Sequence, residues 1–152
     1  MWIGTCNVFL FFDGASVSVY CFCAHAADST PPTVSSAVVE DGARTSIVLT
    51  FSETPVVASA LSATDFEIVV DSGTAVSPSA ASIDGDTIVL TAATAIGNGN
   101  VVTVSYTASG TSEQKIKDAA GNSVATFAGQ AVTNNVAAGG TCIPLPPLPC
   151  AL

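Results

Sequence analysis

The stretch AVSPSAASIDGDTIVLT at residues 75–91 decides the fold. Asp84 and Gly85 form a strong signal for a tight hairpin turn, and apolar residues alternate with small polar ones beyond it. Alternation with a period of two is typical of a half-buried β-strand. The stretch therefore predicts a hairpin of residues 75–83 and 87–91. Its first strand is expected at a sheet edge, because Pro78 cannot donate a backbone hydrogen bond.

The same pattern recurs along the chain between turns rich in Gly and Asp. Further strands are predicted at residues 33–39, 45–51, 66–70, 102–106 and 124–133, and a short helical turn at residues 62–65. The aromatic residues on core positions of these runs are Phe51, Phe66, Tyr106 and Phe127. Short strands at this spacing predict an all-β, immunoglobulin-like Greek-key β-sandwich of about seven antiparallel strands.

Composition limits the class of partner. The chain has 152 residues, 49% of them apolar and 10% charged, with a formal net charge of −9. A chain this acidic repels the phosphates of nucleic acids and anionic membrane surfaces, so we expect neither as a partner. Cations, and Ca²⁺ in particular, are the attractive class. The alternative is that the acidic residues simply keep a secreted protein in solution.

The chain divides into three parts by composition. Residues 1–27 contain two apolar runs and a small-x-small pattern at residues 24–26, which predict a signal peptide or an unstructured leader. Asp13 and the lack of an early Lys or Arg argue against a signal peptide, and a wrongly assigned start or a fragment edge is the alternative. Residues 28–135 form the predicted module, and residues 136–152 a proline-rich tail or linker. No apolar stretch is long enough for a spanning helix.

Cysteine and histidine give little sign of chemistry. The five cysteines all lie outside residues 28–135; Cys142 and Cys150 could close a proline-filled loop in an oxidising compartment. The one histidine, His25, lies in the leader, so no Ser-His-Asp or Cys-His arrangement can form in the module. No phosphate-binding glycine loop and no metalloprotease motif is present. The sequence therefore predicts a protein that is not an enzyme.

An ordered set of short segments carries a family resemblance. The segments are DSTPPTV at 28–34, IVLTFSE at 47–53, ATDF at 63–66, VVTVSY at 101–106, DAAGN at 118–122 and AVTNN at 131–135. In this order the chain resembles the SwmB-type (SWM) repeat, an immunoglobulin-like or cadherin-like module of bacterial surface proteins.

The resemblance implies a place and a set of partners. Such modules usually stand in tandem within long secreted or surface-attached proteins, with roles in motility-associated surface layers, adhesion and envelope architecture. The implied location is extracellular or on the bacterial cell surface, and the implied partners are neighbouring repeat modules or other surface proteins. This chain departs from the pattern in carrying one copy.

Strand direction predicts a metal site. If neighbouring strands are antiparallel, Asp28, Glu53, Asp118 and Asn122 all lie at the pole where the chain enters the module. Ca²⁺ binds about six to eight such oxygen ligands in proteins. We therefore expect a calcium site formed by these four residues. The alternative is that Asp118 and Asn122 only cap a turn, with Gly121 supplying an unusual φ angle.

Two other binding functions compete with a structural role. The first is a carbohydrate-binding module of a secreted enzyme or adhesin, which would stack glycans on exposed aromatic rings. The one tryptophan, Trp2, lies in the leader, and the aromatic residues of the module fit core positions. The second is docking of a protein through the edge strand near Pro78, although proline itself hinders strand addition.

Overall fold

The computed structural model describes residues 6–13, 16–23, 27–57, 61–112 and 114–139. The chain separates into two compact units, residues 1–30 and 31–152. In the first unit, β1 (Cys6–Asp13) and β2 (Ser16–Cys23) pair as an antiparallel hairpin. Cleavage of residues 1–27 as a signal peptide stays a prediction. His25, Cys142 and Cys150 lie outside the described residues.

The second unit is all-β, as the sequence predicted. Its only helical turns among the described residues are η1 (Asp41–Ala43) and η2 (Ala63–Asp65). Its strands are β3 (Val34–Glu40), β4 (Ser46–Phe51), β5 (Phe66–Val70), β6 (Ala80–Asp84), β7 (Thr87–Thr91), β8 (Val102–Tyr106) and β9 (Phe127–Asn135). β6 is shorter than predicted because the ladder begins only after Pro78, but it does lie at an edge of the sheet.

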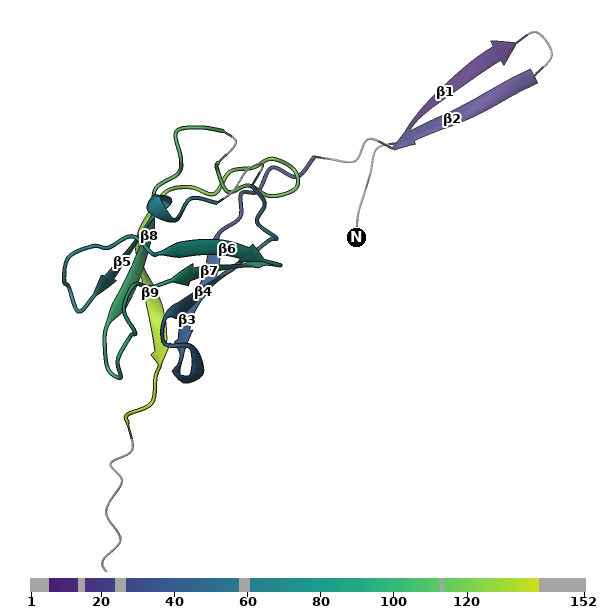
Figure 1. Cartoon of the computed structure of the whole chain (residues 1–152). Coiled ribbons are helices and arrows are strands. Elements are labelled where there is room, and N and C mark those ends of the chain that lie inside the picture. The colour runs from purple at the N-terminus through teal and green to yellow at the C-terminus, as the bar shows by residue number, and fades with distance from the viewer. Residues whose placement is uncertain (1–5, 14–15, 24–26, 58–60, 113, 140–152) are drawn as a thin grey trace, which may run out of the picture. The chain divides into compact units, whose positions relative to one another are not determined.

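The seven strands form one curled sheet in the order β5-β8-β9-β3-β4-β7-β6 (Figure 1). Neighbouring strands are antiparallel except β3 and β9, which run parallel with Val38 opposite Thr133. The prediction that all strands are antiparallel is therefore wrong at this pair. Hairpin turns fix the direction of strands that follow one another, whereas β3 and β9 are the first and last strands of the unit and no turn joins them.

The parallel pair defines two poles. Because β3 and β9 run the same way, the chain enters at the start of β3 and leaves at the end of β9 on the opposite side. We call these the N-terminal pole and the C-terminal pole. The antiparallel pairings place the ends of β4, β6 and β8 at the N-terminal pole. The ends of β5 and β7 lie at the C-terminal pole.

The concave side of the sheet holds the core. On β4, β7 and β8 every second residue is buried, as with Ile47, Leu49 and Phe51 on β4. Tyr106 is 0% exposed, and its ring centroid lies 5.1 Å from that of Phe66 and 5.7 Å from that of Phe127. The predicted core positions of these aromatic residues are confirmed, with Phe127 only partly buried. Burial of each such large apolar side chain stabilises the fold by about 1.5–3 kcal/mol.

A core substitution tests this packing. Leu49 is 0% exposed, whereas Val101 is 68% exposed. We expect Leu49→Ala to lower the free energy of unfolding by about 2–5 kcal/mol, because it removes buried methyl groups and leaves a cavity. Val101→Ala, the matched control, should change it by less than about 0.5 kcal/mol. Urea unfolding measures both, and equal losses in the two variants would contradict the assigned core.

Candidate functional site

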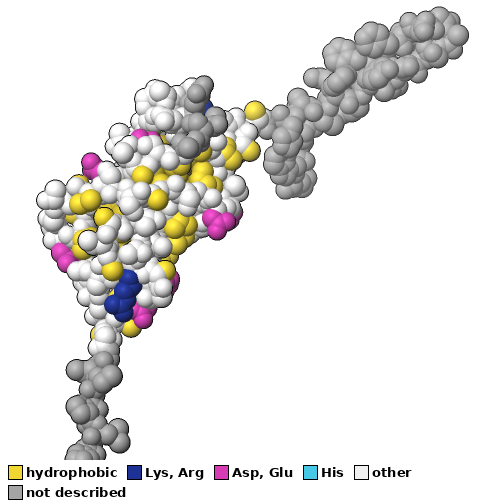
Figure 2. All heavy atoms as spheres, viewed as in Figure 1, with side chains coloured by type: hydrophobic (Ala, Val, Ile, Leu, Met, Phe, Trp, Pro, Cys, Tyr) yellow, Lys and Arg dark blue, Asp and Glu magenta, His cyan; other side chains and the backbone are white. Residues whose placement is uncertain are grey.

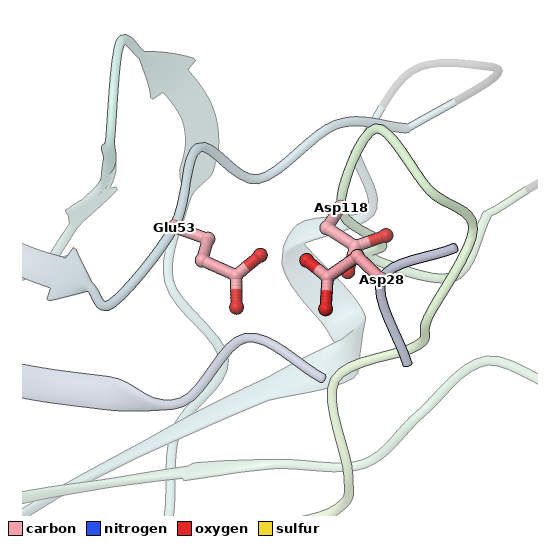
Figure 3. Close-up of side chains that lie close together, drawn as sticks. All are labelled: Asp28, Glu53 and Asp118. Carbon is pink, nitrogen blue, oxygen red and sulfur yellow. The ribbon is translucent and has the colours of Figure 1, made fainter. Parts of the chain in front are cut away.

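Three of the four predicted ligands lie together. Asp28 precedes β3, Glu53 follows β4, and Asp118 lies in the loop between β8 and β9. Each offers a carboxylate oxygen, and these three oxygens lie within 4.8 Å of one another (Figure 3). Figure 3 shows the carboxyl groups turned toward a common space. We call Asp28, Glu53 and Asp118 the carboxylate cluster.

The fourth residue, Asn122, supports the cluster through Asp118. Its backbone N–H donates to Asp118 Oδ1 at 2.8 Å, and its side-chain Nδ2 donates to Asp118 Oδ2 at 2.7 Å. The Asp118 N–H in turn donates to the Asn122 carbonyl at 3.0 Å. Gly121 completes the turn with a φ of 95°, a left-handed conformation that favours glycine. This loop therefore contains the hydrogen bonds expected of a capped turn. The same bonds fix the direction of the Asp118 carboxylate.

Backbone pairing holds this loop beside the segment after β4. Val56 and Lys117 exchange two hydrogen bonds, from Val56 N–H at 2.6 Å and from Lys117 N–H at 2.9 Å. The Tyr106 hydroxyl accepts a further bond from the Ile116 N–H at 3.4 Å. These contacts bring Glu53 and Asp118 together although they are distant in sequence. The Val56–Lys117 pair could not be predicted from the sequence, because no local turn signal marks it.

The electrostatic state of Asp118 follows from its surroundings. Asp118 is 4% exposed and is the buried charged residue among the described positions. Desolvation raises its pKa, but hydrogen bonds from the Asn122 side chain and from the backbone of Asn122, Gly121 and Ala120 outweigh it. The net result is a pKa below the ordinary value of 3.8. Asp118 is therefore a carboxylate at neutral pH, as a cation ligand must be.

Asp65, the last residue of η2 and the one before β5, has the opposite shift in pKa. Its Oδ2 is buried without a hydrogen-bond partner among the described residues, and desolvation raises its pKa. It does not belong to the carboxylate cluster. A carboxyl group in this setting is destabilised when charged, so it makes a poor member of a cation site without a partner.

The spacing of the cluster suits one hard cation. Oxygen atoms bound to the same Ca²⁺ at about 2.3–2.6 Å lie at most about 5 Å apart. Three carboxylate oxygens within 4.8 Å of one another fit inside that span. Three negative charges at such separations also repel one another, and a divalent cation would relieve that repulsion.

Two shallow hollows provide no titratable groups. One, of about 230 Å³, is lined by apolar and small polar side chains that include Ile68, Val76 and Thr94. The other, of about 140 Å³, lies between the start of β3 and residues 124–127. Among the described residues, neither is lined by an acidic or basic side chain. What they offer chemically is therefore apolar contact.

Comparison with known proteins gives one match. The family model with the description "Putative flagellar system-associated repeat", the SWM repeat, matches residues 27–111, which is more than half of the chain. The match includes Asp28 and Glu53 and ends before the loop of Asp118 and Asn122. No curated protein and no solved structure showed significant similarity. Within the described residues, no helix has the length and apolar character needed to cross a membrane.

The pH dependence of stability tests the state of Asp118. A depressed pKa means that this carboxylate stabilises the fold above its unfolded pKa and loses that contribution as the pH falls through the folded value. We expect Asp118→Asn to lower the melting temperature at pH 7 and to flatten the decrease between pH 5 and pH 2. Glu67→Gln, which removes an exposed carboxylate from β5, serves as the control. Parallel melting curves for wild type and Asp118→Asn would contradict the assignment.

Proposed function

The chain belongs to the SWM repeat family, and on that premise we propose that it is a structural and adhesion module of a bacterial secreted or cell-surface protein. In its full context the module stands in a tandem array, so its nearest partners are neighbouring repeats and other surface proteins. The module works outside the cell and performs no catalysis. Its contribution is mechanical, since it sets distance and direction between the parts that it joins.

The observation that carries this proposal is the parallel pairing of β3 and β9. This pairing sends the chain in at one pole and out at the other, as Figure 1 lets the reader follow for the second unit. Modules with termini at opposite poles join end to end, each one extending the array by its own length. A module whose termini met at one pole would instead hang from the array as a side branch.

The strand order supports an immunoglobulin-like Greek-key sandwich as the finer description of the fold. In such sandwiches the strands A, B, E and D form one layer and C, F and G the other. Here β3-β4-β7-β6 and β5-β8-β9 occur in these orders, joined by the β3–β9 ladder. The curled sheet is therefore a sandwich whose two layers meet along one edge.

Burial of the aromatic residues favours this role over carbohydrate binding. A glycan-stacking surface needs exposed rings on a flat face. Phe51, Phe66 and Tyr106 are buried, and Phe127 packs against Tyr106. That the module performs no catalysis is part of the same proposal, and the apolar core on the concave side of the sheet supports it.

Calcium is the proposed cofactor of the module. The carboxylate cluster supplies three oxygen ligands, and Asn122 holds Asp118 in place through its amide nitrogen. Glu53 and Asp118 belong to loops at the N-terminal pole, which is the end that faces the preceding repeat in an array. A cation there would stiffen the joint between repeats and take additional oxygen ligands from the neighbour or from water.

Calcium titration tests the cofactor. Extracellular calcium modules bind with dissociation constants of about 10⁻⁴–10⁻³ M. At 10 mM CaCl₂ we therefore expect the melting temperature to rise by roughly 5–10 °C. Glu53→Gln should abolish most of this rise, because it removes one ligand charge. Glu67→Gln should keep it. An unchanged melting temperature in wild-type protein, together with no heat in calorimetric titration, would exclude the calcium site.

The array itself is tested in the source bacterium. We expect the complete gene to encode further copies of the Asp-Ala-Ala-Gly-Asn pattern of residues 118–122 at intervals of about 100 residues. An antibody against the module should label intact cells or the culture medium, and proteinase K added to intact cells should remove the cell-bound signal. A gene with one copy, or a product found only after cell lysis, would contradict the proposal.

A further inference from the structure

The two edges of the curled sheet differ in how they are covered. β5 lies at one edge, and Val76 bridges to it, with Ile68 N–H donating to the Val76 carbonyl at 2.8 Å and Val76 N–H donating to the Ile68 carbonyl at 3.0 Å. β6 lies at the other edge. Among the described residues, no strand or bridge pairs with the outer side of β6. An uncovered edge presents backbone groups that another strand can pair with.

β6 lacks several of the features that protect an edge strand, although it is short and ends in the charged residue Asp84. Its five residues, Ala80 to Asp84, pair with β7 without a bulge and include no lysine and no proline. Pro78 precedes the strand and is buried rather than placed along the edge. Ser79 fixes that approach by donating from both its N–H and its hydroxyl to the Thr91 carbonyl, at 2.8 and 3.1 Å. The five paired residues of β6 can therefore offer an edge without a proline among them.

The residues of β6 are complementary to a second copy of themselves. In an antiparallel pair centred on Ser82, Ala81 would lie opposite Ile83, and Ala80 opposite Asp84. Each large side chain thus meets a small one, and the one charged residue meets a neutral one. Ala81 and Ile83 are partly buried against the core, so the pair would also join the margins of two cores. Two copies of a chain with a net charge of −9 repel each other, so a contact between them must not place carboxylates opposite one another.

We propose that β6 is a self-association edge, through which two copies of this chain pair as antiparallel strands about a two-fold axis at Ser82. Figure 2 shows acidic side chains standing singly on the visible face, with neutral and apolar ones between them. β6 has one charged residue, Asp84 at its end, and its first four residues offer a neutral contact. A five-residue edge buries little surface, so a single pair is a weak contact of the transient class.

The biological role of the β6 contact rests on the proposed function, in which the module is one of a tandem array. In an array, each weak β6 contact would be repeated once per module, and linked contacts bind far more tightly than single ones. The two-fold axis reverses the second copy, so arrays paired in this way run antiparallel. Edge pairing would then join neighbouring arrays side by side, as a surface layer requires.

Sedimentation equilibrium of the full chain under reducing conditions tests the edge. The wild-type chain should be a 15.1 kDa monomer when dilute, and its average mass should approach twice that value at millimolar concentration. Ser82→Lys and Ser82→Glu each place two like charges together at the axis, and each variant should stay monomeric. A one-to-one mixture of the two should associate at least as strongly as wild type. The matched controls Thr103→Lys and Thr103→Glu change an outward position of the central strand β8 and should associate like wild type.

The outcomes separate this inference from the proposed function. A wild-type chain that stays monomeric at millimolar concentration, or Ser82 variants that associate like wild type, would overturn the edge pairing and leave the repeat module untouched. A mixture that fails to associate would also overturn it, provided that both variants melt like wild type. If the chain associates through β6 but its complete gene encodes a single repeat, the self-association edge is supported and the tandem array is contradicted.

Discussion

The parallel ladder between β3 and β9 is the contact on which the rest of the structure depends. It joins the first and last strands of the unit through Val38 and Thr133 and their neighbours. Without it, β3-β4-β7-β6 and β5-β8-β9 would be two separate sheets facing one core. The ladder also fixes where the chain enters and leaves, because parallel strands begin at the same pole. The pairing of β3 and β9 therefore determines how the sheet encloses the core and at which pole each loop lies.

Burial of apolar side chains in the core supplies the free energy that brings β3 and β9 together. Inward residues on the strands are Val, Ile, Leu, Phe and Tyr, and their burial supplies the driving force that closes the curl. A bulge near Gly129, whose φ is 66°, interrupts the β8–β9 ladder between Phe127 and Gln130, before β9 goes on to pair with β3 from Thr133. The register shift between Val34 and Ser36 adjusts β3 in a similar way. These two register shifts allow the single sheet to curl around the core.

Several elements could be predicted from the sequence because period two and turn chemistry are local. Residues 66–70, 87–91 and 102–106 form strands as predicted, since buried residues alternate with less buried ones over most of each run. β9 begins at Phe127 and not at residue 124 as predicted, because Val124 donates its N–H to the Ile116 carbonyl within a loop.

The parallel pair of β3 and β9 could not be predicted, since these strands are distant in sequence and only the complete fold brings them together. Strand counting placed Glu53 and Asp118 at one pole, and the spacing of Asp118, Gly121 and Asn122 suggested a capped turn. That the Asn122 side chain donates to the Asp118 carboxylate depends on the geometry of that turn.

Nuclear Overhauser contacts between backbone protons of β3 and β9 test the central claim most directly. The structure predicts contacts between Val38 and Thr133, Val39 and Asn134, and Glu40 and Asn135, advancing in the same direction along both strands. Contacts that advance in opposite directions, or none between these strands, would contradict a closed sheet with termini at opposite poles.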